Sequence, residues 1–251
     1  MSDRSQSPGD SIAEPSSQTG TEFFAELGRY LGSANTRLQL LGNLLEHIYL
    51  ALVPLVLGIV LAVVAGWAGK RWPRTRPALL VASNLLYTIP SLALFVVIPG
   101  IIGSKILDSI NVVLALTLYT AALLVRPVLD ALDAVPPHVI SAATALGYRP
   151  ARRFLGVELP LAVPVLTAGV RVASVSNISL VSVGALIGTG GLGVLFTDGF
   201  QREYFSPIVV GIVLTLALAL VVDLLLVLLR NVLTPWRSAG NASAPVEVKT
   251  A

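Results

Sequence analysis

Long apolar runs without charges alternate with short polar segments along most of the chain. These runs occupy 48–69, 77–104, 109–125, 172–197 and 204–222. A bilayer core about 30 Å thick needs roughly 20 apolar residues in one helix. Three runs need their ends moved past a charge, at Arg126, Arg171 and Asp223. We therefore predict an all-α integral membrane protein, a bundle of five helices give or take about one, over 48–69, 78–102, 109–130, 161–183 and 205–229.

Composition supports a membrane protein and excludes several other classes. Hydrophobic residues make up 55% of the 251 positions, glycine not included, and charged residues 12%. Soluble domains contain roughly 45–50% apolar residues, glycine included, and about 25% charged residues. A water-soluble enzyme, a disordered protein and a nucleic-acid binder are excluded on these grounds. The chain has no Cys and only two histidines, His47 and His138, too few for a histidine-rich metal centre, so we predict no metal site and no cofactor. Both histidines are expected at the surface.

The positions of Lys and Arg predict the orientation in the membrane, because basic loops stay in the cytoplasm. The first and third connections between spans are the basic ones; their residues are Lys70, Arg71, Arg74, Arg76, Arg126, Arg149, Arg152 and Arg153. The second connection has only Lys105 and the fourth only Arg202. We therefore expect the N-terminus outside and the C-terminus in the cytoplasm.

The segments outside the spans are polar or amphipathic. Residues 1–20 and 238–251 are rich in Ser, Gly, Pro and charge, which predicts disordered tails. Between the first tail and the first span, apolar residues recur at helical spacing over 21–45, which predicts an amphipathic helix. That helix either lies on the membrane surface or packs against the bundle. The transmembrane domain is then 46–235.

The connection over 134–160 is much longer than the others and is patterned. Val139, Ile140, Ala143 and Leu146 fall on one helical face, and Gly147 ends that helix. A second short helix is expected over 151–157, ending at Leu159-Pro160. Two short helices around a glycine turn have the right shape to dock into a groove of a soluble partner. An ordinary amphipathic hairpin at the membrane surface would show the same pattern.

This connection also carries a recognisable motif. Ser141-Ala142-Ala143, Gly147, Val157 and Leu159-Pro160 resemble the cytoplasmic "EAA" loop of bacterial ABC importer permeases, whose consensus has Glu where this chain has Ser141. The resemblance implies that this loop, with Arg152 inside it, contacts an ATPase, with one charged contact missing at Ser141. A Gly147→Asp change is expected to uncouple or unseat the ATPase because a side chain would fill the tight turn.

Further segments resemble the permeases of glycine betaine, carnitine and choline importers. They are 88–94 in the second span, Leu118-Tyr119 in the third, 157–162, 168–171 and the glycine-rich 185–193. The resemblance implies a pore of two permeases, identical or sister chains, in the bacterial cytoplasmic membrane. It also implies cytoplasmic ABC ATPase subunits and an extracytoplasmic substrate-binding protein as partners.

The glycine-rich segment matches G-x-G-x-x-G over 188–193 but does not predict a nucleotide site. The neighbouring sequence is membranous and no acid follows about 20 residues later, as a dinucleotide site would require. The chain also lacks a P-loop motif, so ATP hydrolysis must reside on a separate subunit and this chain is not an enzyme. Gly188, Gly190 and Gly191 serve either close helix packing or a gate in the pathway.

Two charges are predicted inside spans, and they are expected to meet. Arg171 in the fourth span and Asp223 in the fifth lie at comparable depths from the cytoplasmic side, and a lone charge inside a bilayer is unfavourable. We predict that the two pair and hold the fourth and fifth helices together. The alternative is that Arg171 extends its side chain to the cytoplasmic surface.

Residues for the translocation pathway are predicted around the prolines of the second span. Pro90 leaves backbone carbonyls without donors, which membrane helices tolerate where protein or water satisfies them. The candidates are Tyr87, Thr88, Pro90, Ser91, Tyr119 and Asn177. Tyr87 and Tyr119 would meet a quaternary ammonium group by cation–π contact. Ordinary helix kinks are the alternative.

The sequence thus predicts a permease subunit of an ATP-driven importer for osmoprotectants such as glycine betaine, carnitine, choline or proline betaine. Three alternatives stay open. They are an ABC permease for an amino acid such as methionine, an ATP-independent secondary carrier, and a membrane scaffold without transport activity.

Overall fold

The computed structural model describes residues 20–236, and over that range its regular secondary structure is all helical. The predicted tails, 1–20 and 238–251, lie outside the described residues apart from Gly20. The helices are α1 (Gly20–Gly32), α2 (Ala34–Arg71), η1 (Pro73–Thr75), α3 (Arg76–Thr88), α4 (Ser91–Ile102), α5 (Ser109–Asp133), α6 (Pro137–Ala145), α7 (Pro150–Arg153), η2 (Phe154–Glu158), α8 (Leu159–Gly184), η3 (Ala185–Ile187), α9 (Gly193–Gln201) and α10 (Phe205–Leu233).

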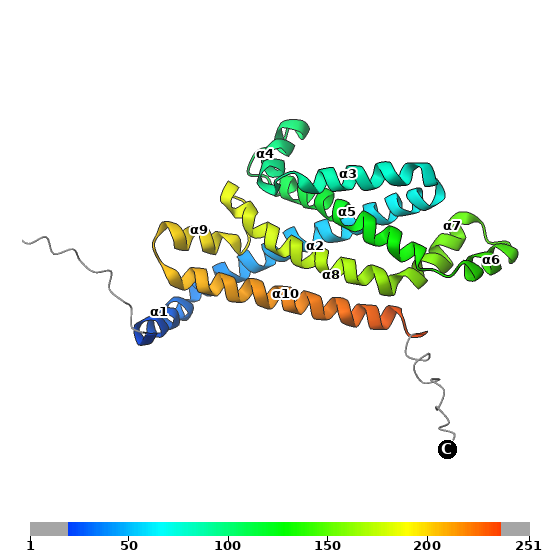
Figure 1. Cartoon of the computed structure of the whole chain (residues 1–251). Coiled ribbons are helices and arrows are strands. Elements are labelled where there is room, and N and C mark those ends of the chain that lie inside the picture. Colours follow the sequence, from blue (N-terminus) through cyan, green and yellow to red (C-terminus); the bar gives the residue numbers. More distant parts are fainter. Residues whose placement is uncertain (1–19, 237–251) are drawn as a thin grey trace, which may run out of the picture.

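The molecule is an elongated bundle in which α2, α5, α8 and α10 run lengthwise beside one another (Figure 1). The short helices α6 and α7 project from one end, and α9 and α1 lie at the other. In the described part of the chain, α2, α5, α8 and α10 are each long and apolar enough to cross a membrane. The bent pair α3–α4 would supply a fifth crossing, in agreement with the predicted number.

The centre of the bundle is α5, which is buried along most of its length. It packs closely against α2 because α2 presents small residues at four-residue spacing, Gly58, Ala62 and Gly66. A methyl group at Gly58 would overlap the side chain of Thr120, and one at Gly66 that of Val128. Small residues at this spacing let membrane helices approach each other closely. The outer helix α10, by contrast, buries few residues and exposes a largely apolar surface.

The predicted amphipathic helix over 21–45 is wrong in its extent. The helix α1 ends at Gly32, Ser33 takes an extended conformation, and residues from Ala34 onward belong to α2, which is 38 residues long. The reason is that nothing between Ala34 and the first apolar run breaks a helix. The aromatic ring of Tyr30 packs edge-on against Tyr204 at the start of α10, with ring centroids 5.8 Å apart. The C-terminal end of α1 therefore docks on the bundle.

The second predicted span, 78–102, is not one helix. It divides into α3 and α4, whose axes differ by 102°. The break falls at Ile89-Pro90, where both residues are extended. Proline lacks the N–H that would continue α3, and it disfavours a helical conformation of the residue before it. Pro99, in contrast, lies inside α4 without ending it.

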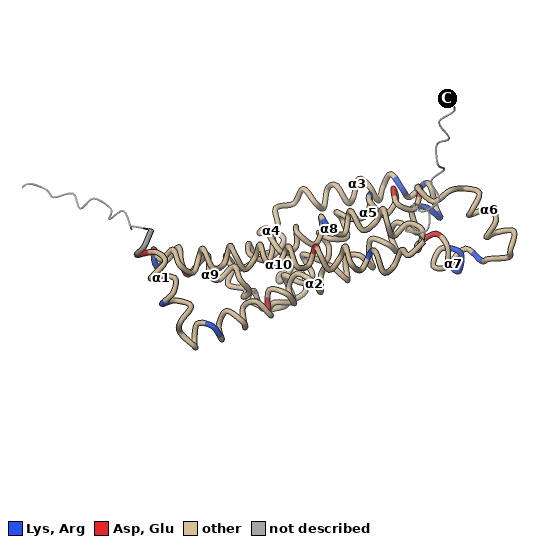
Figure 2. Tube along the Cα trace, turned by 90° about the horizontal axis from the view of Figure 1, so that it is seen from below, with Lys and Arg blue, Asp and Glu red and all other residues tan. Residues whose placement is uncertain are grey.

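Lys and Arg gather at the end of the bundle that carries α6 and α7 (Figure 2). We call this the basic end. Its basic residues come from the α2–α3 connection and from the α6–α7 segment, namely Lys70, Arg71, Arg74, Arg76, Arg149, Arg152 and Arg153. The helix α10 also ends there (Figure 1).

Candidate functional site

The helix α6 is short and largely exposed. It begins after Pro136, with Pro137 in its first turn, where the missing N–H has no helical partner in any case. Of its nine residues only Ala143 is buried, while Ser141 and Ala142 face outward. Of the three motif residues in α6, Ala143 therefore anchors the helix, and Ser141 and Ala142 remain accessible.

The turn after α6 is a Schellman motif centred on Gly147. The backbone N–H of Tyr148 donates to the carbonyl of Ala143 at 3.1 Å, and that of Gly147 donates to the carbonyl of Thr144 at 3.0 Å. Gly147 has a φ of +82°, a left-handed conformation that side chains disfavour. A Cβ at this position would meet no atom within 4 Å. The expectation that a side chain would fill the turn is therefore wrong: the glycine is required by its backbone conformation.

The second helix of this connection does not end at Leu159-Pro160 as predicted. The helix α7 continues through a π-helical turn, η2, directly into α8. The N–H of Leu159 donates to the carbonyl of Phe154, five residues earlier. Pro160 then lies in the first turn of α8, where a proline, which has no N–H, is tolerated. Val157 and Leu159 are half-buried. Arg152 lies over the ring of Tyr148, 5.3 Å from its centroid.

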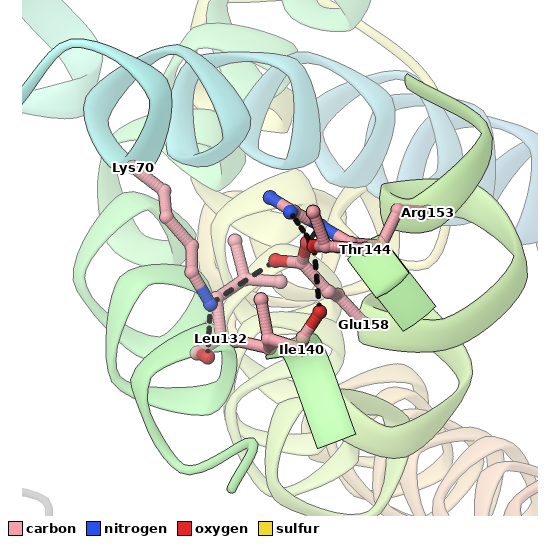
Figure 3. Close-up of polar contacts among 6 residues, drawn as sticks. All are labelled: Lys70, Leu132, Ile140, Thr144, Arg153 and Glu158. Atoms are coloured by element: carbon pink, nitrogen blue, oxygen red, sulfur yellow. Dashed lines mark hydrogen bonds and ion pairs between the residues drawn. The ribbon is translucent and has the colours of Figure 1, made fainter. Parts of the chain in front are cut away.

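A buried carboxylate joins these elements to the bundle (Figure 3). Glu158 is 3% exposed. Its Oε1 accepts from Nε of Arg153 at 2.8 Å, and its Oε2 lies 3.2 Å from Nζ of Lys70. Lys70 also donates to the carbonyl of Leu132 at 2.6 Å, and Arg153 donates to Oγ1 of Thr144 at 2.7 Å. Sequence reasoning missed this network because Lys70 lies on another span, far along the chain from Glu158 and Arg153.

At the opposite end of the bundle, the glycine-rich segment is held by two side chains of α2. The N–H of Gly191 donates to Glu46 at 3.2 Å, and the N–H of Leu192 donates to Nδ1 of His47 at 3.1 Å. The other ring nitrogen of His47 lies 3.0 Å from the carbonyl of Ile178 in α8. His47 is fully buried, so its expected place at the surface is wrong.

Different features of the structure explain why glycine occupies these positions. Gly188 and Gly191 have φ values of +86° and +84°. Gly190 lies against the carboxylate of Glu46, which would have to move if position 190 carried a side chain. We call residues 188–192 the glycine loop.

The predicted pathway residues do not form one group. Thr88 is exposed and donates to carbonyls of its own helix, and Pro90 and Ser91 lie at the exposed α3–α4 break. Tyr87 and Tyr119 contact each other edge-on, with centroids 5.6 Å apart. Tyr119 is buried, and its hydroxyl has no hydrogen-bond partner among the described residues.

Asn177 lies elsewhere, in the buried contact between helices. Its amide donates to the carbonyl of Ala51 at 3.2 Å and accepts from Oγ1 of Thr120 at 3.0 Å. The side chain therefore bridges α8, α2 and α5.

Arg171 and Asp223 meet across α8 and α10. Nε of Arg171 lies 2.5 Å from Oδ1 of Asp223, and Nη2 lies 2.7 Å from Oδ2, a bidentate ion pair. The two side chains remain 41% and 27% exposed, beside a cavity of about 560 Å³ that Ser176 and Ser179 also line. Within residues 20–236, no group of three or more His, Asp or Glu could hold a metal ion.

Comparison with known proteins identifies the family. Residues 36–233 match the family described as "Binding-protein-dependent transport system inner membrane component". The osmoprotectant import permease protein OsmW of Salmonella typhimurium is 36% identical over 193 residues, which are 76% of this chain and 89% of that protein. The choline transport system permease protein OpuBB of Bacillus subtilis is 30% identical over 200 residues, 78% of this chain and 89% of that protein.

Two further matches extend the comparison. The ergothioneine transport permease/ergothioneine binding protein EgtU of Helicobacter pylori is 38% identical over 157 residues, 62% of this chain but 27% of that protein. An inward-facing structure of the MetNI methionine ABC transporter superposes with a TM-score of 0.68 at 23% identity, covering 80% of this chain and 99% of that chain, which shows a shared fold. The family match covers most of the chain, and this multi-pass inner-membrane permease therefore belongs to the binding-protein-dependent transport system inner membrane components.

Proposed function

We propose that the chain is the transmembrane permease subunit of an ATP-driven importer that takes up osmoprotectants such as glycine betaine, carnitine, choline or proline betaine. The support is its similarity to permeases named for osmoprotectants and for choline. Choline, glycine betaine and carnitine share a trimethylammonium group, which defines the substrate class.

The observation that carries the proposal is the exposed α6–Gly147–α7 unit at the basic end of the bundle. In the proposed importer, this unit docks into a groove of a cytoplasmic ABC ATPase, the helix-in-groove mode. Ser141, Ala142 and Arg152 supply accessible surface, while Ala143, Val157, Leu159 and Pro160 fix the unit to the bundle. The chain itself transmits the conformational change of the ATPase and forms part of the passage for the substrate.

The orientation proposed here puts the basic end in the cytoplasm and the N-terminus outside. The rule that basic loops stay inside supports this assignment. The glycine loop and α9 then face the extracytoplasmic substrate-binding protein. Loaded binding protein would release its substrate into the pore from that side.

A second permease chain, identical or a sister, would complete the pore. An ion pair that is half-exposed at membrane depth is unfavourable toward lipid tails, so protein or water must cover Arg171 and Asp223. The apolar surface of α10 would meet either lipid or that second chain. Tyr87, Thr88, Pro90, Ser91 and Tyr119 are proposed for the pathway, and Gly188, Gly190 and Gly191 for a gate. Asn177, which bridges three helices, would act on the pathway only through their packing.

The test begins with purification of this chain in mild detergent from its native membrane and identification of the proteins that accompany it. We expect a soluble P-loop ATPase in the eluate, and a sister permease as well if the pore is heteromeric. The complete importer is then reconstituted in liposomes, and uptake of radiolabelled glycine betaine is measured with and without ATP.

Competition then defines the substrate. Unlabelled choline and carnitine should compete, and methionine should not; competition by methionine would favour the amino-acid permease. Ergothioneine, which also carries a trimethylammonium group, tests the relation to EgtU. If no ATPase co-purifies and the chain alone moves solute, the secondary-carrier alternative replaces the proposal.

A further inference from the structure

Glu158 is a buried acid at the point where the exposed α6–α7 segment joins the membrane-spanning helices. Its side chain is 4% exposed, and each of its two oxygens is paired with a different cation. A buried charge requires partners, because the interior solvates it poorly. The sequence motif that identifies this loop does not include position 158, so its role needs a separate explanation.

The partners of Glu158 come from different elements (Figure 3). Lys70 lies in the last turn of α2 and also donates to the carbonyl of Leu132 near the end of α5. Arg153 is the last residue of α7 and donates to Thr144 in the last turn of α6. A chain of contacts of 3.2 Å or less therefore runs from α6 through α7 and Glu158 to α2 and α5.

The helix α6 has few other ways to act on the bundle. It buries only Ala143, and Ile140 packs partly against the core. At its two ends the chain passes through Pro136 and through the turn at Gly147. A pull on α6 therefore reaches the bundle through the short connection to α5 at Pro136, through the packing of Ala143 and Ile140, and through the Thr144–Arg153 hydrogen bond.

The network resists separation of its members. If α7 moved away from α2, one oxygen of Glu158 would lose its cation while the carboxylate stayed buried, which is strongly unfavourable. When α7 moves, the change of lower free energy is for α2, the end of α5 and the start of α8 to move with it. The local arrangement thus favours joint movement of these helices.

We propose that Glu158 is a positioning residue that makes α2, α5 and α8 move with the ATPase-docked helix α6. This inference rests on the proposed function, since it assumes that an ATPase moves α6. In the assembled importer, Glu158 then determines whether the conformational change of the ATPase is transmitted to the pore. It does not determine whether the ATPase binds.

The test uses the complete importer in proteoliposomes, with Glu158→Gln in the permease. Three quantities are measured: co-purification of the ATPase, stimulation of ATP hydrolysis by loaded binding protein, and uptake of radiolabelled glycine betaine. We expect co-purification to stay within about twofold of wild type, and stimulation and uptake each to fall about tenfold. The matched control is Asp133→Asn, which removes an exposed ion pair with Arg76 at the same end and should change none of the three quantities.

A second pair of variants covers the case in which Glu158→Gln does not accumulate. Thr144 is exposed on α6, so Thr144→Val leaves the core packing in place; it removes the acceptor of Arg153 together with the hydroxyl's own bond to the carbonyl of Ile140. Thr144→Val should lower stimulation about threefold with unchanged co-purification, and Thr144→Ser should restore it. A role in packing alone would not make the hydroxyl matter.

The outcomes separate the inference from the proposed function. Unchanged stimulation in a folded Glu158→Gln importer, or equal stimulation by Thr144→Val and Thr144→Ser, overturns the inference alone. Lost ATPase co-purification in Thr144→Val also overturns it, because Thr144 would then act by direct docking. If the wild-type chain recovers no ATPase and takes up no glycine betaine with ATP, the proposed function fails and the inference with it.

Discussion

Replacement of Gly147 distinguishes backbone strain from crowding in the turn after α6. The residue has a φ of +82°, and a Cβ there would meet nothing within 4 Å. The cost of Gly147→Ala is therefore the left-handed backbone alone, about 1–2 kcal/mol for an L residue. Asn adopts this conformation more readily than Ala does. Since 1.4 kcal/mol corresponds to about tenfold, Gly147→Ala should lower the population of the native turn by about tenfold.

The assay is ATPase co-purification and stimulated ATP hydrolysis of the reconstituted importer. Strain predicts activity in the order Gly147, then Gly147→Asn, then Gly147→Ala, although Asn has the larger side chain. Gly147→Asp has nearly the same shape as Asn, so any difference between those two variants measures the effect of negative charge at the docking surface.

The control is Gly156→Ala in the η2 turn of the same connection. Gly156 also has open space around its Cβ position, but its φ is not positive. The substitution should therefore be neutral or slightly stabilising. If Gly147→Ala matched wild type, or if Asn were worse than Ala, the strain argument would be refuted.

The remaining predictions concern packing, the charge pair and the glycine loop. Gly58→Ala should destabilise by about 1–3 kcal/mol through overpacking, whereas Gly42→Ala, with open space on the same helix, should not; denaturant titration in detergent compares them. Asp223→Asn should reduce the folded yield on size-exclusion chromatography, and adding Arg171→Gln should restore it. His47→Ala should cost about 1–3 kcal/mol by leaving a buried backbone amide unpaired, seen as faster hydrogen exchange in the glycine loop.

The sequence predicted helices well where apolar runs and helix signals coincide. The prediction 109–130 corresponds to Ser109–Asp133, and 205–229 to Phe205–Leu233. Both helices begin at a clear polar boundary. The break at Pro90 was visible as a proline in an apolar run, but the 102° turn depends on how α3 and α4 pack on α5. Local sequence cannot supply such an angle.

The candidate site shows the same division between local and distant information. Gly147 was predictable because a Schellman turn involves only residues close in sequence. Glu158 was not, because its partner Lys70 lies on another span. His47 was misplaced for a similar reason, since its partners Ile178 and Leu192 are 131 and 145 residues away. The signal that was available was an ionisable residue at the edge of an apolar run, which is unfavourable there without a partner.

The helices α2 and α8 are tied to each other at both ends. At the basic end, Lys70 of α2 holds Glu158, which immediately precedes α8. At the other end, His47 of α2 holds the carbonyl of Ile178 in α8 and the amide of Leu192 in the glycine loop. His47 and Lys70 are 23 residues apart, about 35 Å along a helix, and α2 is continuous between them.

Contacts at both ends of α2 and α8 have a different consequence from a contact at one end only. If only one end were tied, a displacement at the basic end would be absorbed by sliding of α2 along α8. With both ends tied, sliding would strain the buried contacts of Glu158 and of His47 together. The close packing of α2 against α5 at Gly58 and Gly66 opposes lateral movement of α2. We therefore expect a displacement that enters through α6 to be carried by α2 and α8 together to the glycine loop.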